Sequence, residues 1–276
     1  MPSVDTARRN APGSRETRGS RGASDRVGAD EALAAASGGV GKRAYVRRIF
    51  SEIAPRYDLL NHVLSLNIDR SWRRRAIAAL GWEREPAGTY VDVCAGTLDV
   101  AAELAGRVGF RGFVVGADFA EPMLRAGRAK ARAVGGGRVG PVVADALELP
   151  IADGEAAGAI VAFGVRNLAD LDAGLRELAR VLAPGARLVI LEFSRPAFPL
   201  LRAVYTTYFR YLLPIIGGVV SGHPSAYRYL PESVAHFPVE DGLAERMRRA
   251  GLVSVAWSRV SFGIAAIHSG TKPGAR

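Results

Sequence analysis

The stretch TYVDVCAGTLD at residues 89–99 constrains the fold most, because it joins a short apolar run to a helix-like segment through one tight turn. The apolar run covers residues 90–94, and Gly96 lies in the turn before the amphipathic stretch DVAAELAGRV. This order predicts a strand, a turn and a helix. The first turn of such a helix directs free backbone N–H groups and the positive end of its dipole at a ligand. A cofactor is therefore the first hypothesis.

An acidic residue should follow about 20 residues later, at the end of the next strand, to accept hydrogen bonds from ribose hydroxyls. The segment RGFVVGAD ends at Asp118 and meets that expectation. The turn has only one glycine, since Cys94 and Leu98 stand at the flanking glycine positions of a D-x-G-x-G-x-G pattern. On this stretch alone, a strand-to-helix connection without a ligand stays an alternative.

The 276 residues suffice for one large α/β domain with a tail, or for two small domains. A hydrophobic fraction of 49% with 23% charged residues is typical of a soluble globular protein. The single cysteine excludes an intramolecular disulfide, and the four histidines lack the i, i+4 spacing of a helical metal pair. We therefore expect no protein-bound metal.

The formal net charge of +10 raises the question of nucleic-acid binding, which depends on where the charge lies. Residues 1–48 hold ten basic and five acidic residues, so half of the excess is in this segment. The remaining excess is mild, and it suits an anionic membrane surface as well as nucleic acid. We expect no nucleic-acid partner.

Residues 1–44 are predicted to be a disordered basic tail. Up to about residue 40 the segment is rich in Arg, Ser, Gly and Ala, with no aromatic residue and no apolar period, so it cannot offset the entropy of ordering. A mitochondrial transit peptide is the alternative; arginine favours it, whereas the acids and the lack of an amphipathic stretch count against it. We expect deletion of residues 1–40 to leave folding and turnover unchanged.

From residue 45 apolar residues recur at helical spacing, with aromatic residues among arginines. One interpretation is that one or two amphipathic helices pack on the main domain. The other is that Tyr57, Trp72 and Arg73 line a site over the turn at Gly96.

Strands and helices alternate from residue 89 to residue 192. Near-continuous apolar strands between amphipathic helices predict a parallel sheet covered on both faces, with ligands beyond the carboxyl ends of the strands. Gly96, Asp118, Asp145 and the loop after Phe163 fall on that edge. The expected strands after the first are 111–118, 141–146, 157–163 and 187–193, and the expected helices are 121–134 and a segment that stops at Pro184 and Gly185.

Residues 195–240 interrupt the alternation with an aromatic segment that Arg202, Arg210 and Pro214 break too often for it to span a bilayer. It is either a helix that closes the core, or a cap over a lipophilic pocket or membrane surface. A helix at 239–250 and strands at 253–260 and 263–269 follow, and their tight connection predicts a terminal antiparallel hairpin.

These features together resemble the S-adenosylmethionine-dependent C-methyltransferases of menaquinone and ubiquinone biosynthesis. The resemblance implies an α/β fold of the class I methyltransferase, Rossmann-like type, with a seven-stranded, mostly parallel sheet and an antiparallel last strand. Residues 45–276 would form this domain, with 195–240 as a substrate-side insertion. The matching stretches cover about residues 47–272 and include FSEIAPRYDLLNHVLSLNIDRSWRR, VDVCAGTLD, ADALELP, FGVRNLADLDAGLRELARVLAPGARLVILEFSRP, SAYRYLPESV and GIAAIHSGTK.

By position, the resemblance assigns S-adenosyl-L-methionine to Gly96 and Thr97 in the first turn, Asp118 at the ribose, and Asp145 with Ala146 beside the adenine. The spacing supports Asp118, and a carboxylate at Asp145 can accept from the exocyclic amine. For each acid, a strand-end cap or a surface charge is the alternative. We expect this cofactor rather than a nicotinamide dinucleotide, because no second nucleotide half follows.

The family usually has glycine where Leu98 and Asn67 stand. Leu98 and the arginine-rich tail support a hypothesis of another class, a non-catalytic protein of the same fold that binds RNA or a membrane surface.

The chemistry implied by the resemblance is methylation of a quinol ring carbon. A quinol hydroxyl, a phenol with a pKa of about 10 by analogy with tyrosine, must lose its proton so that charge reaches the adjacent carbon. That carbon then attacks the methyl group in line in a water-poor site. Arg166 is a poor base, but its guanidinium can hold the phenolate, while Asn167 and Tyr57 orient the ring or a water. Loop-capping polar residues are the alternative for the Arg-Asn pair.

The substrate implied is a lipophilic quinol whose polyprenyl tail would use the apolar residues of 198–229. Family enzymes methylate demethylmenaquinol, a methoxybenzoquinol or both, and we favour demethylmenaquinol on breadth of occurrence. We expect a cytoplasmic protein with peripheral contact at the inner face of the cell membrane, and leave a homodimer open.

Overall fold

The computed structural model describes residues 30–36, 38, 41–59, 65, 67–134, 137–196, 198–208 and 224–274; for residue 204 and residues 224–228 it describes the backbone alone.

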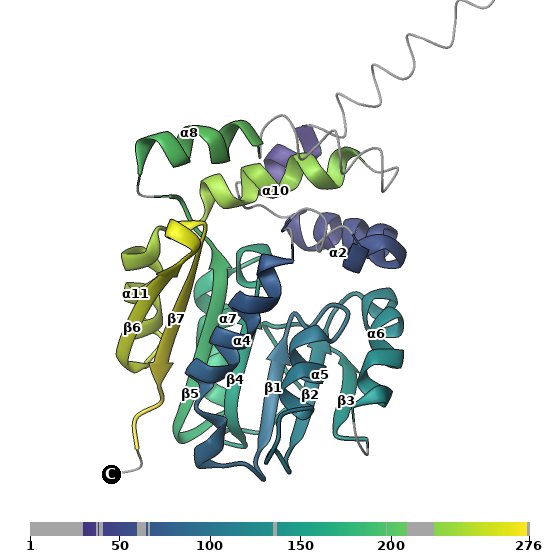
Figure 1. The fold of residues 1–276 in the computed structure, drawn as a ribbon, viewed down its shortest axis with the longest axis vertical. Coiled ribbons are helices and arrows are strands. Elements are labelled where there is room, and N and C mark those ends of the chain that lie inside the picture. The colour runs from purple at the N-terminus through teal and green to yellow at the C-terminus, as the bar shows by residue number, and fades with distance from the viewer. Residues whose placement is uncertain are drawn as a thin grey trace, which may run out of the picture.

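A seven-stranded sheet with the order β3-β2-β1-β4-β5-β7-β6 forms the centre of the molecule (Figure 1). Neighbours among β1 to β5 are parallel, whereas β7 runs antiparallel to both β5 and β6. The expected seven-stranded sheet with an antiparallel last strand and a terminal hairpin is therefore confirmed. The strands are β1 (Thr89–Val93), β2 (Phe113–Asp118), β3 (Val139–Val143), β4 (Ala156–Ala162), β5 (Leu182–Phe193), β6 (Val253–Val260) and β7 (Ala265–Thr271).

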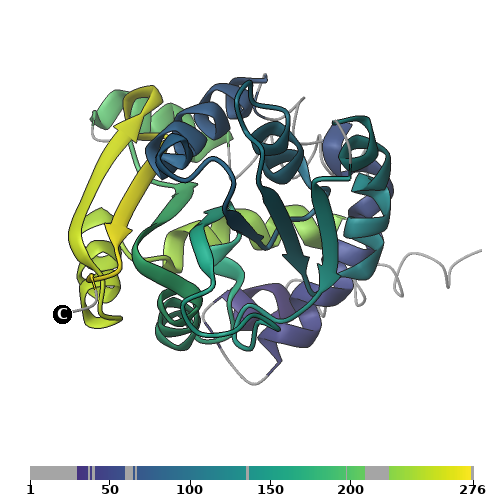
Figure 2. The same cartoon turned by 90° about the horizontal axis from the view of Figure 1, so that it is seen from below.

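Helices cover both faces of the sheet, as Figure 2 shows from below. One core lies between the sheet and α4, α5 and α6, and a second core lies between the sheet and α7 and α11. The longer helices are α2 (Lys42–Ile53), α4 (Ile68–Leu80), α5 (Asp99–Ala105), α6 (Glu121–Ala133), α7 (Leu171–Val181), α8 (Pro199–Thr207), α10 (Pro224–His236) and α11 (Glu240–Arg249), and the short 3-10 helices are η1 (Ala54–Arg56), η2 (Trp82–Arg84), η3 (Val165–Asn167) and η5 (Ser261–Gly263).

Three helices, α2, α8 and α10, lie above the carboxyl ends of the parallel strands (Figure 1). The alternating pattern predicted this edge as the ligand side. Of the 195–240 segment, α8 and α10 are described, and both lie over this edge.

Several boundaries differ from the sequence prediction, and the contacts explain two of them. The third strand ends at Val143, before Asp145, because the Asp145 carboxylate accepts a hydrogen bond from the Leu147 N–H at 2.9 Å and closes a local turn. Helix α7 ends at Val181 rather than at Pro184, because Leu182 already pairs with Ala156 of β4.

The prediction of disorder up to about residue 40 is wrong for residues 30–36, which form a helix. Its alanines 32, 35 and 36 are buried, and they join an apolar cluster with Tyr45 and Ile49 of α2. The sequence signal for this helix is weak, because three alanines on one face give little hydrophobic periodicity. Their small side chains nevertheless fit closely against larger ones. The predicted tail is also too long at its other end, since α2 begins at Lys42. Residues 1–29 lie outside the described residues.

The turn after β1 has an unusual backbone. Cys94, Gly96 and Leu98 have φ of 56°, 52° and 63°, a left-handed region in which glycine is least strained. The same holds for Asn67, at φ 60°. Leu98 is fully buried, and a methyl group built on Gly116 of β2 would lie 2.4 Å from its Cδ2. The Leu98 side chain therefore fills the space beside Gly116.

Deletion of residues 1–36 should destabilise the protein, whereas deletion of residues 1–29 should not. Loss of three buried alanine methyl groups costs about 2 kcal/mol, which lowers Tm by roughly 4 to 8 °C in a domain of this size. Thermal denaturation of the two truncated proteins and the full chain measures the difference. Equal Tm values for all three would show that the 30–36 helix contributes nothing.

The Leu98–Gly116 packing predicts strong coupling between the two positions. Leu98→Gly alone leaves a cavity and should cost about 2 to 4 kcal/mol, even after relief of backbone strain. Gly116→Leu alone overpacks the core by about 1 to 3 kcal/mol. The double variant should recover at least about 2 kcal/mol of the summed loss, measured by urea denaturation. Additive losses would contradict the packing described above.

Candidate functional site

A pocket lies at the carboxyl edge of the sheet, between the turn after β1, the ends of β2 and β3, and η3. Four residues predicted to bind cofactor or substrate line it: Asp118, Asp145, Ala146 and Asn167. The full lining is Arg43, Cys94, Ala117, Asp118, Phe119, Ala144, Asp145, Ala146, Asn167, Leu168 and Ala169.

Asp118 ties the glycine turn to the end of β2. Its two carboxylate oxygens accept hydrogen bonds from the backbone N–H groups of Gly96 and Ala120, both at 2.8 Å. Burial raises the pKa of this carboxyl. The residue is thus a strand-end cap, which was the alternative interpretation, and it also lines the pocket. Each oxygen retains a lone pair for a ligand.

Asp145 meets a partner that the sequence did not suggest. Arg43 of α2 reaches its carboxylate with an N–O distance of 2.7 Å, and the arginine side chain is 64% exposed. An ion pair this exposed is worth about 0 to 1 kcal/mol, so a ligand can displace it at little cost. Ala146, next in the chain, is buried.

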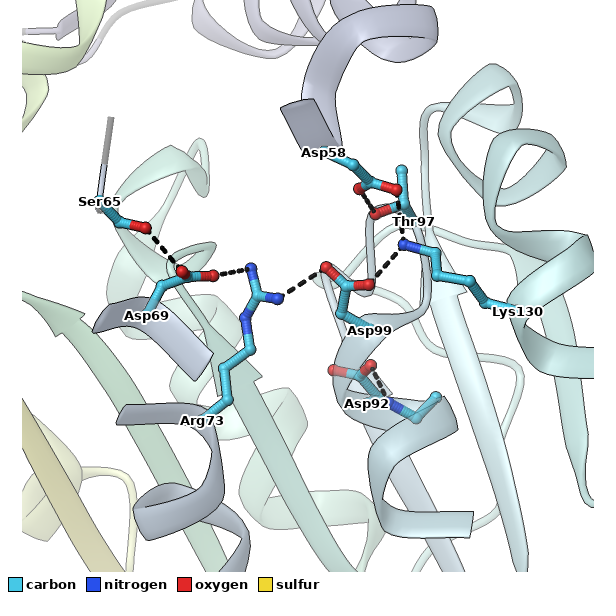
Figure 3. A network of polar contacts seen from close by, with 9 residues as sticks. Asp58, Ser65, Asp69, Arg73, Asp92, Thr97, Asp99 and Lys130 are labelled. Atoms are coloured by element: carbon cyan, nitrogen blue, oxygen red, sulfur yellow. Dashed lines mark hydrogen bonds and ion pairs between the residues drawn. The ribbon is translucent and has the colours of Figure 1, made fainter. Parts of the chain in front are cut away.

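Thr97 belongs to a polar network rather than to the pocket lining. Its hydroxyl donates to Asp58 Oδ1 at 2.5 Å, and Lys130 of α6 joins Asp58 to Asp99 (Figure 3). Arg73 of α4 continues the network to Asp99, with an N–O distance of 2.6 Å. The network fastens the cofactor turn to the chain segment after α2. A direct contact between Thr97 and the cofactor stays a prediction.

Of the aromatic residues proposed over the turn, Tyr57 lies there. A methyl group built on Gly96 would be 3.8 Å from Tyr57 Cε1, and the ring of Phe50 meets the tyrosine edge-on. Trp72 instead packs against Phe163 in the core. Of the two interpretations left open for this segment, packing on the main domain holds for Trp72, because helix α4 turns this side chain toward the sheet.

Arg166 and Asn167 lie in η3, beside the pocket. Arg166 is 8% exposed, and its Nη1 donates to Glu192 Oε1 at 2.6 Å and to the Phe163 carbonyl at 2.5 Å. Its Nε is buried and has no hydrogen-bond partner among the described residues. The same holds for Oδ1 of Asn167. Buried polar atoms are normally paired with protein groups or with water, so a ligand or a bound water can serve as partner for these two atoms.

Two residues that the sequence analysis missed hold this loop. Glu192 at the end of β5 binds Arg166, and Lys42 of α2 donates from Nζ to the Arg166 carbonyl at 2.8 Å. An acid at the end of an apolar strand, the signal that identified Asp118, could have identified Glu192. No comparable signal marks Lys42 or Arg43.

An aromatic cluster lies over the same loop. Tyr45 and Tyr229 face each other with ring centroids 5.6 Å apart, and Tyr57, Phe119, Phe193, Tyr205 and Tyr208 pack against the same group. Burial raises the pKa of Tyr45 to about 12 and also raises the pKa of Tyr205 and Tyr229. These phenols are protonated at neutral pH, so they can donate hydrogen bonds but are poor bases.

The apolar residues predicted to hold a tail have different positions. Tyr205 and Tyr208 join the aromatic cluster, whereas Phe198 and Leu200 are 64% and 80% exposed. Phe209, Tyr211, Leu212 and Leu213 lie outside the described residues.

The pocket residues fit S-adenosylmethionine. Asp118 and Asp145 offer carboxylate acceptors for ribose hydroxyls and an exocyclic amine, and the unpaired Asn167 Oδ1 offers another acceptor. A side chain at Gly96 would enter the space between Tyr57 and Met123 Cε, 3.3 Å from the latter. Leu98 is not part of the pocket lining and points toward Gly116, so the larger residue does not block the site.

Comparison with known proteins agrees with this geometry. The chain is 50% identical over 225 residues to a demethylmenaquinone methyltransferase of Thermus thermophilus, covering 82% of this chain and all of that one. It is 46% identical to a demethylmenaquinone methyltransferase of Deinococcus radiodurans, covering 82% and 92%. A ubiquinone/menaquinone biosynthesis C-methyltransferase UbiE of Geobacter sulfurreducens is 42% identical, covering 82% and 88%.

Solved structures share the fold at much lower identity. An S-adenosylmethionine-dependent methyltransferase of Thermotoga maritima, a possible histamine N-methyltransferase, superposes with a TM-score of 0.58 at 18% identity, over 82% of this chain and 98% of that one. The model of the ubiE/COQ5 methyltransferase family matches residues 39–272. The chain therefore belongs to the ubiE/COQ5 methyltransferase family.

Proposed function

We propose that the protein methylates a ring carbon of a polyprenylated quinol, with S-adenosyl-L-methionine as methyl donor and demethylmenaquinol as acceptor. The observation that carries the proposal is the buried Arg166, whose Nε lacks a partner beside the cofactor pocket. A phenolate oxygen is a ligand of suitable charge for this donor. Relatives named demethylmenaquinone methyltransferase support the acceptor.

S-adenosylmethionine, when bound, supplies an electrophilic methyl group. We assign its ribose to Asp118, its adenine to Asp145 and Ala146, and the rest of the molecule to the turn at Gly96. The exposed Arg43 then gives up its ion pair with Asp145 or moves with the ligand.

The residues at the acceptor site favour loss of the quinol proton. A free phenol has a pKa of about 10, and each unit by which a nearby cation lowers it requires about 1.4 kcal/mol of interaction. Arg166 provides that cation in a place where water is largely excluded, which strengthens the interaction. Tyr57 and Asn167 would orient the ring over the glycine turn.

Methylation of a methoxybenzoquinol in ubiquinone biosynthesis stays the alternative acceptor, since the relative from Geobacter sulfurreducens bears a name that covers both quinones. The non-catalytic hypothesis has lost one of its two supports, because Leu98 packs against Gly116 outside the pocket.

A membrane surface is the natural source of such a substrate, and we propose peripheral contact at the inner face of the cell membrane. None of the helices within the described ranges is long and apolar enough to cross a bilayer. Phe198 and Leu200 at α8, and Phe262 in η5, are 64%, 80% and 77% exposed. Elements α8 and η5 are neighbours in both views (Figures 1 and 2). Apolar side chains exposed beside the substrate edge suit insertion into the headgroup region.

The purified protein should transfer one methyl group to demethylmenaquinol. Reduced naphthoquinols and benzoquinols with long and short tails are incubated with labelled S-adenosylmethionine, and the mass gain is followed. Two buried methylene groups contribute about 1.6 kcal/mol, so tailed acceptors should have a KM at least tenfold lower.

Asp118→Ala should weaken cofactor binding at least tenfold, since a charged hydrogen bond contributes about 1.5 to 3 kcal/mol.

Asp153→Ala is the matched control for that variant, because the Asp153 side chain is 79% exposed and pairs with Arg180 away from the pocket. Methylation of the benzoquinol alone would exclude the proposed head group, and equal rates on tailed and tailless quinols would exclude binding of the polyprenyl tail.

The triple variant F198S/L200S/F262S should lose most of its binding to anionic phospholipid vesicles while retaining turnover on a detergent-dispersed short-tailed quinol. Val108→Ser is the control, because Val108 is 98% exposed but lies between α5 and β2, at the opposite edge of the sheet. Co-sedimentation measures binding. An equal loss for both variants would refute the proposed membrane surface.

A further inference from the structure

Glu192 is the most buried carboxylate in contact with the proposed acceptor site. It is the second-last residue of β5 and is 2% exposed. Its Oε1 accepts from Arg166 Nη1 at 2.6 Å and from the Phe193 N–H at 2.9 Å, and its Oε2 accepts from the Arg166 N–H at 3.3 Å. Glu192 thus binds both the backbone and the side chain of Arg166.

These contacts determine which edge of the guanidinium remains available. Glu192 and the Phe163 carbonyl both take hydrogen bonds from Nη1, which occupies one corner of the group. The Phe193 ring packs against the guanidinium, with Cζ 5.4 Å from the ring centroid. The Nε corner is left without a partner among the described residues. A guanidinium held at one corner presents its other N–H groups in a fixed direction.

The other titratable groups around the pair cannot replace this carboxylate. Lys42 from α2 adds positive charge next to the loop, and burial and Arg166 lower its pKa. Burial raises the pKa of the phenols of Tyr205 from α8 and Tyr229 from α10, and that of the thiol of Cys94. These last three groups are neutral at pH 7, so Glu192 supplies the negative charge in direct contact with Arg166.

Stability alone does not explain a buried ion pair. Taking both charges out of water costs free energy that the pair regains only in part, and apolar residues of similar volume are often as stable. A requirement for a charged group at a fixed position explains why the pair is present.

We propose that Glu192 is a positioning residue for the reaction: it fixes Arg166 so that the Nε edge faces the quinol oxygen, and it balances the arginine charge between turnovers. This inference rests on the proposed function. Glu192 acts through Arg166 and does not itself take the quinol proton.

Glu192→Gln should lower kcat at least tenfold and leave the KM for S-adenosylmethionine within twofold. The Gln side chain has an amide N–H2 group in place of one carboxylate oxygen, and this donor faces an N–H group of Arg166, so Arg166 is displaced. A displaced guanidinium stabilises the phenolate less. The acid limb of the pH profile of kcat/KM for the quinol should therefore move to higher pH by half a unit or more. Loss of packing alone would not move this limb.

Glu240→Gln is the matched control, because Glu240 is a buried carboxylate paired with Arg259 at 2.6 Å, away from the pocket. It should change neither kcat nor the pH profile. The double variant E192L/R166M removes both charges. If Glu192 acts only through Arg166, this double variant should be no less active than R166M. This comparison tests the proposal even if Glu192→Gln folds poorly.

A readout without turnover comes from ¹⁵N NMR of the arginine Nε–H groups, with the Arg166 signal assigned by its absence in R166K. The signal should be sharp and slow to exchange in the wild type, and averaged in Glu192→Gln. An unchanged signal and an unchanged kcat in Glu192→Gln would overturn the inference, as would disappearance of the acid limb, which would identify Glu192 as the proton acceptor. Failure of the wild type on every quinol, with the NMR result as expected, would refute the proposed function but not the positioning of Arg166 by Glu192.

Discussion

The hydrogen bond from the Gly96 N–H to the Asp118 carboxylate is the contact on which the site depends. It joins two adjacent parallel strands just beyond their paired residues, and it fixes a turn whose backbone lies in the left-handed region at three positions. Asp92 of β1 accepts from the Ala101 N–H at 3.0 Å, and burial raises its pKa to about 8. Burial also raises the pKa of Asp118, and the two backbone N–H groups that it binds oppose this rise.

The sequence predicted the sheet and its ligand edge well, because both follow from local signals. Apolar strands that alternate with amphipathic helices specify the layers, and acids at the ends of strands specify Asp118 and approximately Asp145. The partners Arg43, Asp58 and Lys42 could not be predicted in this way. Lys42 and Arg166 are 124 residues apart, and no periodicity links positions at such a separation.

The places where the prediction failed have a shared physical origin in tertiary packing. The helix at 30–36 forms because three small side chains fit a neighbouring surface, whereas the sequence analysis looked for large apolar residues. In the sequence, Leu98 departs from the glycine pattern of the turn; in the structure, its side chain packs against Gly116. In both cases the decisive quantity is the volume available beside another element, which a single sequence does not contain.

The contacts of α2 have a consequence for synthesis of the chain. This helix is made before the sheet, yet Lys42 binds a carbonyl in η3, and Arg43 binds the loop after β3. Its docking partners emerge from the ribosome only after another hundred residues, and closing so long a loop costs entropy before any contact rewards it. The wall of the site that comes first in the sequence therefore cannot dock before η3 has been made, and a nascent chain that lacks β5 has no completed site.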